Sequence, residues 1–298
     1  MKRRKFIEKT SLTGLALGAL PGSLRANAKQ LNQPEADAQV NPGLGTVEKI
    51  NHSVCHWCFE DIPFEEFLIT LRRLGIGAID LVGPKDWPLL KKHNIHCSMC
   101  NGAELSLVEG WNNPEYHPQL IENYEAMIPL VAEAGYTNLI CFSGNRDGMS
   151  DAEGLANCVS GLRQVLPLAE KHGVVLQMEL FNQIDHPDYM CDNSAWGIAL
   201  CQALGSENFK LLFDIYHMQI QEGDIIRSIQ NNHQYFGHYH TAGVPGRHEI
   251  DETQELYYPA IMQAIAQTGF NGFVAQEFIP TGSDTIASLI RAIEICDV

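Results

Sequence analysis

The feature that most limits the fold of this chain is a regular alternation of short strand-like segments and longer helix-like segments. The strand-like segments are rich in β-branched and other apolar residues, and the segments between them repeat apolar residues at helical spacing. Strands are expected over residues 50–59, 78–82, 95–100, 137–142, 174–180, 209–215, 235–241 and 272–278. Helices are expected over residues 63–74, 87–93, 119–134, 152–171, 194–204, 224–231, 257–268 and 283–296. About eight βα units in succession predict a (β/α)₈ TIM barrel.

One barrel accounts for most of the 298 residues, since a typical (β/α)₈ domain has about 250. We expect it to occupy residues 47–298 as a single domain. A doubly wound open sheet is the structural alternative, because it shares the alternation of strands and helices. The barrel is favoured because candidate ligands follow four consecutive strands. The carboxyl ends of such strands surround one mouth in a barrel but lie along an edge in an open sheet.

The start of the chain has the three parts of an export signal. A basic stretch with the pair Arg3-Arg4 precedes an apolar segment over 12–20 and a small-x-small motif at 26–28. This order is typical of a signal peptide, and the paired arginines resemble a twin-arginine signal. We therefore expect residues 1–28 to direct export to the periplasm and residues 29–46 to form a linker. A membrane anchor that is never cleaved is the alternative.

The charge balance limits the partners. The formal net charge is −16 at pH 7, and basic residues do not cluster outside the first residues. Such a chain repels nucleic acid and anionic membranes, so we expect no nucleic-acid partner and no stable membrane partner after signal cleavage. The sequence has no glycine-rich phosphate loop, which argues against a nucleotide cofactor. The expected partner is a small molecule, and the oligomeric state stays open, a homo-oligomer included.

The nine cysteines include two C-x-x-C pairs, Cys55 with Cys58 and Cys97 with Cys100. Together the pairs have the composition of a four-cysteine zinc site. Both pairs fall in strand-like segments, where alternation sends the two cysteines of a pair to opposite faces. Buried cysteines that pack as small apolar residues are therefore the favoured interpretation, with the zinc site as the alternative.

Four residues with metal-binding side chains lie at or near the ends of the last four expected strands. They are Glu179, Asp214, His240 and Glu277. Three carboxylates and one imidazole suit a single divalent ion such as Mn²⁺, Mg²⁺, Co²⁺ or Zn²⁺. Any one of the four could form a structural ion pair. Their equivalent positions predict one metal centre, because strand ends are where barrels build their sites.

Three further residues are candidates for substrate binding. His217 lies three residues beyond Asp214 and could donate a hydrogen bond to a substrate oxygen. Arg247 follows the seventh expected strand, where its guanidinium could hold a carboxylate or a pair of hydroxyls, with Glu249 orienting it. His56, beside Trp57 at the end of the first expected strand, could close the mouth over a small polar substrate; a surface or core histidine is the alternative.

Two glutamates at one metal suggest a proton-transfer mechanism. A metal that bridges a ketone oxygen and the adjacent hydroxyl acidifies the carbon between them. One of the catalytic candidates Glu179 and Glu277 would remove that proton to form a cis-enediolate, and the other would return a proton. Return to the neighbouring carbon gives aldose–ketose isomerisation. Return to the same carbon from the other face gives epimerisation, so the ligand set serves both reactions.

Four segments, 53–59, 213–219, 245–249 and 272–280, resemble the hydroxypyruvate isomerase branch of the xylose isomerase-like barrel superfamily. That superfamily also contains the ketose 3-epimerases and endonuclease IV. The resemblance implies a TIM barrel that converts hydroxypyruvate to tartronate semialdehyde.

By the same resemblance, Glu179 and Glu277 match the catalytic pair, and these two with Asp214 match three metal ligands. Two positions depart from the isomerase pattern. The fourth ligand is His240, where the isomerases tend to carry glutamine and the 3-epimerases histidine, and residues 250–251 are Ile-Asp, where the isomerases usually continue with proline.

Several activities remain open on this site. A ketose 3-epimerase, or a lyase or dehydratase that acts on an oxidised sugar, would use the same residues. A non-catalytic exported sugar-binding protein is a third alternative. An endonuclease IV-like nuclease is disfavoured, because it would need a basic face for the phosphate backbone.

Overall fold

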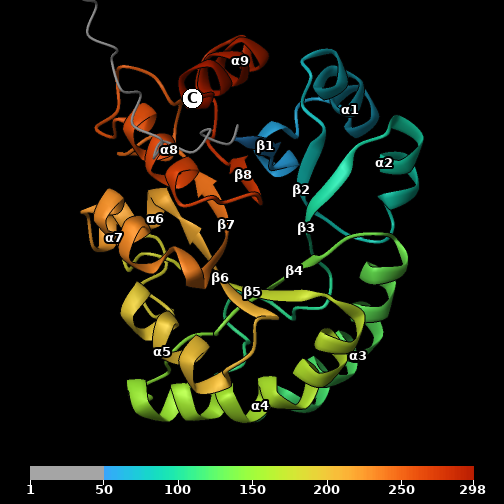
Figure 1. Ribbon diagram of the computed structural model, residues 1–298, viewed down its shortest axis with the longest axis vertical. Coiled ribbons are helices and arrows are strands. Elements are labelled where there is room, and N and C mark those ends of the chain that lie inside the picture. Colours follow the sequence, from blue (N-terminus) through green and yellow to red (C-terminus); the bar gives the residue numbers. More distant parts are fainter. Residues whose placement is uncertain (1–49) are drawn as a thin grey trace, which may run out of the picture. The chain divides into compact units, whose positions relative to one another are not determined.

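The computed structural model describes residues 50–298. The expected signal peptide (1–28) and linker (29–46) lie outside the described residues. Within the described part, eight parallel strands form one sheet in the order β1-β8-β7-β6-β5-β4-β3-β2 (Figure 1). A parallel bridge between Cys55 and Asp80 links the end of β1 to β2. The (β/α)₈ barrel is therefore confirmed and the open doubly wound sheet is excluded, since neighbours in the sheet are neighbours in the chain except for β1 and β8, whose pairing joins the two ends of the chain.

The elements follow the expected alternation closely. The strands are β1 (Asn51–Val54), β2 (Ala78–Val82), β3 (His96–Cys100), β4 (Asn138–Cys141), β5 (Val175–Glu179), β6 (Phe209–Asp214), β7 (Phe236–Thr241) and β8 (Phe273–Gln276). The α-helices are α1 (Phe64–Arg73), α2 (Trp87–His93), α3 (His117–Glu133), α4 (Asp151–His172), α5 (Ser194–Leu204), α6 (Ile215–Gln221), α7 (Ile225–Asn232), α8 (Tyr258–Gln267) and α9 (Thr285–Cys296). Two 3₁₀ helices, η1 (His56–Phe59) and η2 (His233–Tyr235), complete them. No helix among residues 50–298 is long and apolar enough to cross a membrane.

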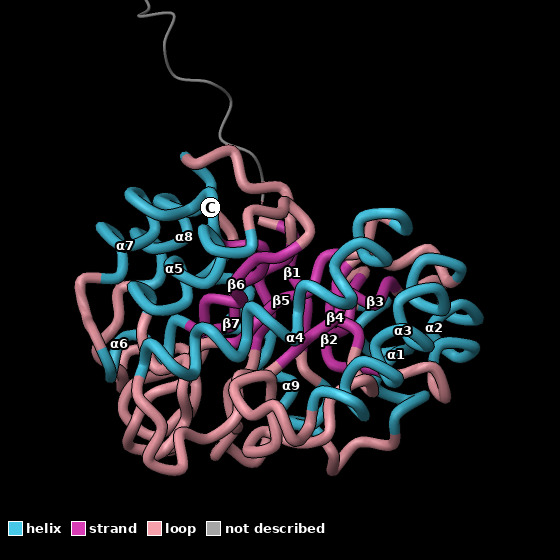
Figure 2. Tube along the Cα trace, turned by 90° about the horizontal axis from the view of Figure 1, so that it is seen from below, coloured by secondary structure: helices cyan, strands magenta, loops and turns pink. Residues whose placement is uncertain are grey.

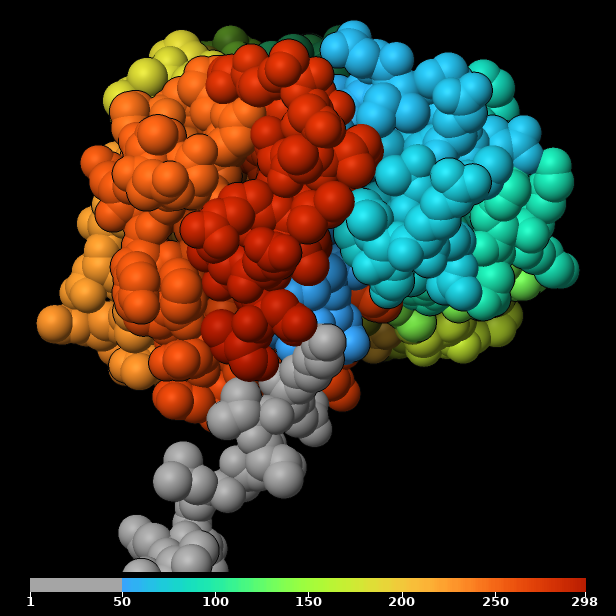
Figure 3. Space-filling view, turned by 90° about the horizontal axis from the view of Figure 1, so that it is seen from above, coloured from blue at the N-terminus to red at the C-terminus, as the bar shows by residue number. Residues whose placement is uncertain are grey.

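The strands are apolar on both faces because helices cover the outside and side chains fill the inside. In β6, for example, every residue except Lys210 is buried. The long loops gather at one end of the barrel, shown as pink tubes in Figure 2. The segments after β3, β5 and β7 belong to this end, since each follows the carboxyl end of its strand. At the barrel seam, β1 pairs with β8, which brings the start of the described chain beside its last segments (Figure 3).

Two local expectations were wrong. Residues 55–59 do not continue the first strand, because the chain turns into η1 directly after Cys55. Residues 215–221, expected as a strand end and loop, form α6 directly after β6. The Asp214 side chain accepts a hydrogen bond from the backbone N–H of His217 (3.1 Å) and so caps this helix. Apolar composition alone could not reveal either turn, since the flanking residues are equally apolar.

The cysteines pack as free residues, as the favoured interpretation expects, but the two sulfurs of one pair do not diverge. All nine are free, and eight are buried. The sulfurs of Cys97 and Cys100 lie 3.5 Å apart, so the expectation that a pair diverges is wrong here. The strand is irregular at this point, because its pairing with β2 shifts register twice. Among the described residues, no group that could hold a metal contains more than one cysteine, so a four-cysteine zinc site does not form.

Candidate metal centre

The four predicted metal ligands converge at the carboxyl end of the barrel. Glu179 and Asp214 are the last residues of β5 and β6, His240 lies on β7, and Glu277 directly follows β8. Their ligand atoms all lie within 4.8 Å of one another, and all four side chains are buried. Sheet register contributes, since Asp214 and His240 are direct partners in the pairing of β6 with β7. The structure thus brings together residues up to 98 positions apart, counted from Glu179 to Glu277 (277 − 179).

The arrangement of donor atoms fits a divalent cation. His240 Nδ1 lies 3.2 Å from Glu179 Oε1 and 2.8 Å from Glu277 Oε2. Glu179 Oε1 and His240 Nδ1 are nevertheless buried without a hydrogen-bond partner. Buried polar atoms are almost always satisfied, so the position of these two atoms, facing each other, fits a shared cation. Oxygen and imidazole nitrogen donors suit Mn²⁺, Mg²⁺, Co²⁺ or Zn²⁺.

The electrostatics of the carboxylates show the cost of grouping them in the barrel. Burial raises the pKa of Asp214 to about 7, with Arg247 opposing the shift and Glu277 adding to it. Burial also raises the pKa of Glu179. Burial acts on Glu277 in the same sense, but His240 and Arg247 outweigh it and hold the pKa of Glu277 well below its usual range. Burial therefore favours protons on Asp214 and Glu179 that a bound cation would displace, whereas Glu277 stays ionised.

Arg247 lies against the ligands. Its guanidinium donates to Glu277 Oε2 and lies 3.4 Å from Asp214 Oδ2. It also lies over the rings of Trp57 (5.2 Å) and Tyr216 (5.4 Å), which are favourable cation–π positions. The backbone of Arg247 is left-handed (φ 60°), a conformation that a non-glycine residue adopts only when its surroundings impose it.

Glu249 does not orient Arg247, contrary to expectation. Its carboxylate accepts hydrogen bonds from the backbone N–H groups of Thr281 (2.6 Å) and Gly282 (2.9 Å). These contacts tie the loop after β7 to the loop after β8. Glu249 therefore acts on the position of the loop that carries Arg247 and not on the guanidinium itself.

His217 points a ring nitrogen toward the ligands. Two N–H groups of Asn182 approach its Nδ1, the side-chain amide at 2.6 Å and the backbone at 3.3 Å. Because Asn182 donates to Nδ1 twice, we assign the ring proton to Nε2, which lies 3.6 Å from Asp214 Oδ2; Arg247 Nη1, a donor 3.2 Å from Nε2, then makes no hydrogen bond with it. Burial, with Arg247 nearby, lowers the pKa of His217, so its ring stays neutral. A neutral imidazole with this tautomer can donate to a substrate oxygen.

A cavity of about 300 Å³ adjoins the ligands. It is lined by Trp57, Leu81, Leu107, Phe142, Glu179, Phe181, His186, Arg247 and Glu277. Trp57 also donates its indole N–H to Glu277 Oε1 (2.8 Å). The cavity is thus apolar around most of its wall and charged at the metal centre, as in a site for a small polar molecule.

His56 is not brought to the cavity. The turn of η1 directs its ring toward α1, where it packs against Phe64 (4.8 Å between centroids) and Phe67 (5.5 Å). Its Nε2 lies 3.4 Å from the carbonyl oxygen of Ile62. The predicted role of His56 in substrate binding therefore finds no geometric support, and the alternative of a core histidine fits its surroundings. The neighbouring Trp57 takes the position at the mouth.

A family model described as xylose isomerase-like TIM barrel matches residues 87–295 of this chain. The chain belongs to the xylose isomerase-like TIM barrel family. The match runs from α2 through most of α9 and so includes β5 to β8, which are labelled in Figure 1. All four candidate ligands therefore lie within the part of the chain that defines the family.

Two curated relatives match shorter parts of the chain. It is 37% identical over 112 residues to 2-oxo-tetronate isomerase from Cupriavidus necator, which covers 38% of this chain and 43% of that protein. It is 27% identical over 168 residues to hydroxypyruvate isomerase from Escherichia coli, covering 56% of this chain and 65% of the relative. Each match spans less than two thirds of the relative's length.

Among solved structures, the fold matches the crystal structure of an AP endonuclease, family 2, from Brucella melitensis. The TM-score is 0.72 at 22% identity, and the match covers 82% of this chain and 97% of that one. A likeness at this identity concerns the fold alone.

Sequence reasoning missed two buried residues beside the ligands of this family member. Asp80 on β2 lies 3.1 Å from His240 Nε2 and 2.7 Å from His238 Nε2, and all three are fully buried. Asp80 was detectable, because it is the only charged residue in the otherwise apolar expected strand 78–82. A charged side chain in such a strand indicates a specific partner.

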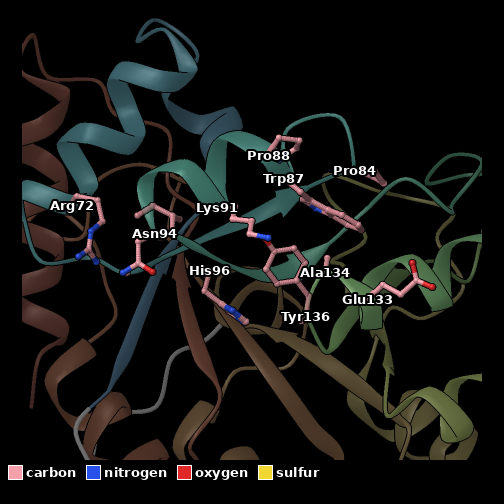
Figure 4. Close-up of a pocket in the computed structure, with 13 residues that line it drawn as sticks. Arg72, Pro84, Trp87, Pro88, Lys91, Asn94, His96, Glu133, Ala134 and Tyr136 are labelled. Carbon is pink, nitrogen blue, oxygen red and sulfur yellow. The ribbon is translucent and has the colours of Figure 1, made fainter.

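A larger cavity of about 750 Å³ lies elsewhere (Figure 4). Its lining includes Gly77, Ile95 and Tyr136, which lie just before β2, β3 and β4, respectively. It therefore opens near the amino ends of the strands and contains none of the four candidate ligands. In TIM barrels this end contributes to stability and the carboxyl end carries the chemistry, so the smaller cavity is the candidate active site.

Proposed function

We propose that this protein is a divalent-metal-dependent isomerase of a small hydroxy-carbonyl acid, of the hydroxypyruvate or 2-oxo-tetronate isomerase kind. The observation that carries the proposal is the position of two glutamates at one centre. Glu179 Oε1 and Glu277 Oε2 both lie within 3.2 Å of His240 Nδ1 and both side chains line the same cavity. Names of the two curated relatives support the reaction class.

The ligands, the two glutamates and His217 have distinct roles in the proposed reaction. Glu179, Asp214, His240 and Glu277 would hold the cation, which when bound supplies Lewis-acid polarisation of the substrate carbonyl. Glu179 and Glu277 are positioned to remove a proton from the carbon beside the carbonyl and to return one to its neighbour. His217, with its proton on Nε2, donates to a substrate oxygen.

The cavity favours a small, negatively charged substrate. Arg247 and His186 are the basic side chains of its lining, and Arg247 can hold a carboxylate through two parallel hydrogen bonds. The apolar wall formed by Leu107, Phe142 and Phe181 excludes water from the reacting carbon. A volume of about 300 Å³ suits an acid of a few carbon atoms better than a polymer.

Ketose 3-epimerisation is the second candidate, and His240 favours it. Members of the isomerase branch tend to carry glutamine at this position, and the 3-epimerases carry histidine. Both reactions begin with the same proton removal, so they differ only in the carbon to which the proton returns.

One experiment separates these activities. The purified protein, loaded with Mn²⁺, is incubated in D₂O with hydroxypyruvate, a 2-oxo-tetronate and a set of free ketoses, and the products are identified by NMR and mass spectrometry. Isomerisation moves the carbonyl to the neighbouring carbon without a change of mass apart from deuterium, and gives an aldehyde from hydroxypyruvate or a ketose and a 3-oxo acid from the 2-oxo-tetronate. Epimerisation gives an inverted ketose. A product lighter by water would identify a dehydratase, and affinity without turnover would identify a binding protein.

Two variants control this experiment. Glu179→Gln should abolish solvent exchange on every accepted substrate, because a glutamine side chain neither accepts nor returns a proton. Glu125→Gln changes an exposed glutamate on α3 and should behave as the wild type. Full turnover by Glu179→Gln would contradict the proposed mechanism.

We also propose that the enzyme works in the periplasm after export by the twin-arginine route. Fractionation of cells that express the whole chain should place the mature protein in the periplasm, and Arg3→Lys with Arg4→Lys should retain it inside the cell.

A further inference from the structure

A buried network of hydrogen bonds lies beneath the metal centre, on the side of His240 that faces away from the other ligands. Its centre is Asp80, which projects into the barrel from β2. Asp80 Oδ2 lies 3.1 Å from His240 Nε2 and 2.7 Å from His238 Nε2. Asp80 Oδ1 accepts hydrogen bonds from the hydroxyls of Ser53 (2.7 Å) and Ser98. All five side chains have zero exposure, so water does not compete for these contacts.

The backbone of β2 is distorted at the point that produces this arrangement. Leu81 has a left-handed backbone (φ 59°), and the pairing of β2 with β3 shifts register on either side of Asp80. In a regular strand Asp80 and Leu81 would face opposite sides of the sheet. Here Leu81 lines the substrate cavity while Asp80 reaches His240, so both face the barrel interior. Irregularities of this kind commonly redirect a side chain next to an active site.

The chemistry of the Asp80 contacts decides which nitrogen of His240 is available. An ionised carboxylate only accepts hydrogen bonds, so the ring nitrogen facing it must carry a proton. That nitrogen is His240 Nε2. The nitrogen that can give up its proton and offer a lone pair to a cation is then Nδ1, which faces Glu179 (3.2 Å) and Glu277 (2.8 Å) and shares a proton with these carboxylates until a cation replaces it.

We propose that Asp80 is a positioning residue that fixes the tautomer and ring orientation of His240, so that Nδ1 is presented to the cation. The inference rests on the metal centre proposed above. Asp80 itself touches neither the cavity nor the other three ligands; it acts through His240, as the outer carboxylate does in carboxylate–histidine–metal arrangements.

A second metal site is the competing interpretation, because ligand atoms of Cys55, Asp80 and His240 also lie within 4.8 Å of one another. The hydrogen bonds argue against it. Both oxygens of Asp80 already accept from two donors each, and a cation there would have to expel the Nε2 proton of His240. The contacts thus favour one cation per chain at Nδ1 of His240 and a proton at its Nε2.

The test compares metal affinity in Asp80→Asn and His238→Phe. In Asp80→Asn an amide N–H₂ can face His240 Nε2, which favours the opposite tautomer and occupies Nδ1 with a proton. Isothermal titration of the metal-free protein with Mn²⁺ should show about 10- to 100-fold weaker binding. His238→Phe removes the other imidazole from the same carboxylate oxygen but leaves the bond between Asp80 and His240. It should lower thermal stability yet keep the Mn²⁺ affinity within about threefold of wild type.

A measurement on the wild type keeps the inference testable if Asp80→Asn does not fold. Protein labelled with ¹⁵N-histidine and loaded with Zn²⁺ should show His240 with a proton on Nε2 and the metal on Nδ1. Coordination through Nε2 would overturn the inference, and so would equal Mn²⁺ affinity in Asp80→Asn and wild type. Two Zn²⁺ per chain, with one lost in Cys55→Ser, would establish the competing site. A wild-type protein that binds no divalent cation would overturn the proposed metal centre itself, which distinguishes the two failures.

Discussion

Asp214 on β6 and His240 on β7 are direct partners in the register of two adjacent parallel strands. This pairing places a carboxylate and an imidazole at the same height in the barrel, and the strand ends on either side add Glu179 and Glu277. Sheet register is rigid, because a slip of one residue would turn every side chain to the other face. The ligand positions are therefore set by the core of the fold and not by mobile loops, which favours a preorganised centre.

His240 should be indispensable for cation binding. We expect His240→Ala to weaken Mn²⁺ binding at least about 100-fold, since it removes a ligand and not only an outer contact. At saturating Mn²⁺ the wild type should gain about 3 kcal/mol of stability, or roughly 6–12 °C in melting temperature, and His240→Ala should gain almost none. His240→Gln keeps an oxygen donor and should show an intermediate shift. Melting curves with and without Mn²⁺ provide the measurement, and equal shifts in all three proteins would refute a role for His240.

Cation affinity should rise with pH. The pKa of Asp214 is raised to about 7, chiefly by burial, so below that pH its carboxyl holds a proton that a cation must displace. As the pH rises through about 7 this competition disappears, and affinity should increase by up to about tenfold per pH unit for each displaced proton. Titration calorimetry in two buffers of different ionisation enthalpy measures the protons released. A binding constant that does not change between about pH 6 and pH 8 would contradict the shifted pKa.

Arg247 should be needed for substrate binding more than for metal binding. Hydrogen bonds between charged groups contribute about 1.5–3 kcal/mol, so Arg247→Ala should lower kcat/KM about 10- to 100-fold, mainly through KM. Arg247→Lys keeps the charge but loses the planar fork and should recover only part of the loss. The matched control is Arg227→Ala on α7, which breaks an exposed ion pair between Arg227 and Asp224. Unchanged KM in Arg247→Ala would exclude contact with the substrate.

The sequence predicted the barrel and the ligand cluster because regular elements were enough to place them. Glu179 and Asp214 end mostly apolar strands, and periodicity locates such ends well. The predictions failed where the backbone departs from regular geometry. His56 was placed at the mouth by extending β1 through what is η1, and Asp80 was overlooked because its direction depends on a left-handed residue at Leu81. Such irregularities come from tertiary packing, which local sequence does not encode.

Glu249 should stabilise the protein above about pH 4 and lose this effect in acid. Burial raises its pKa, but the N–H groups of Gly282 and Thr281 outweigh burial and lower the pKa to about 2. A group with a depressed pKa contributes stability that is complete above its unfolded pKa and disappears as the pH falls through the folded value. Because the side chain is partly exposed, we expect only about 1 kcal/mol, or roughly 2–4 °C in melting temperature.

The measurement for Glu249 is a set of melting curves for wild type and Glu249→Gln at several pH values between about 6 and 3. The wild type should melt higher at the upper end, and the difference should shrink toward the lower end as the carboxylate gains a proton. Glu252→Gln changes an exposed glutamate in the same loop and should show no such convergence. Since Glu249 holds the loop that carries Arg247, its substitution should also raise KM while leaving Mn²⁺ affinity unchanged. A constant difference in melting temperature across the pH range would show that Glu249 acts through packing and not through its charge.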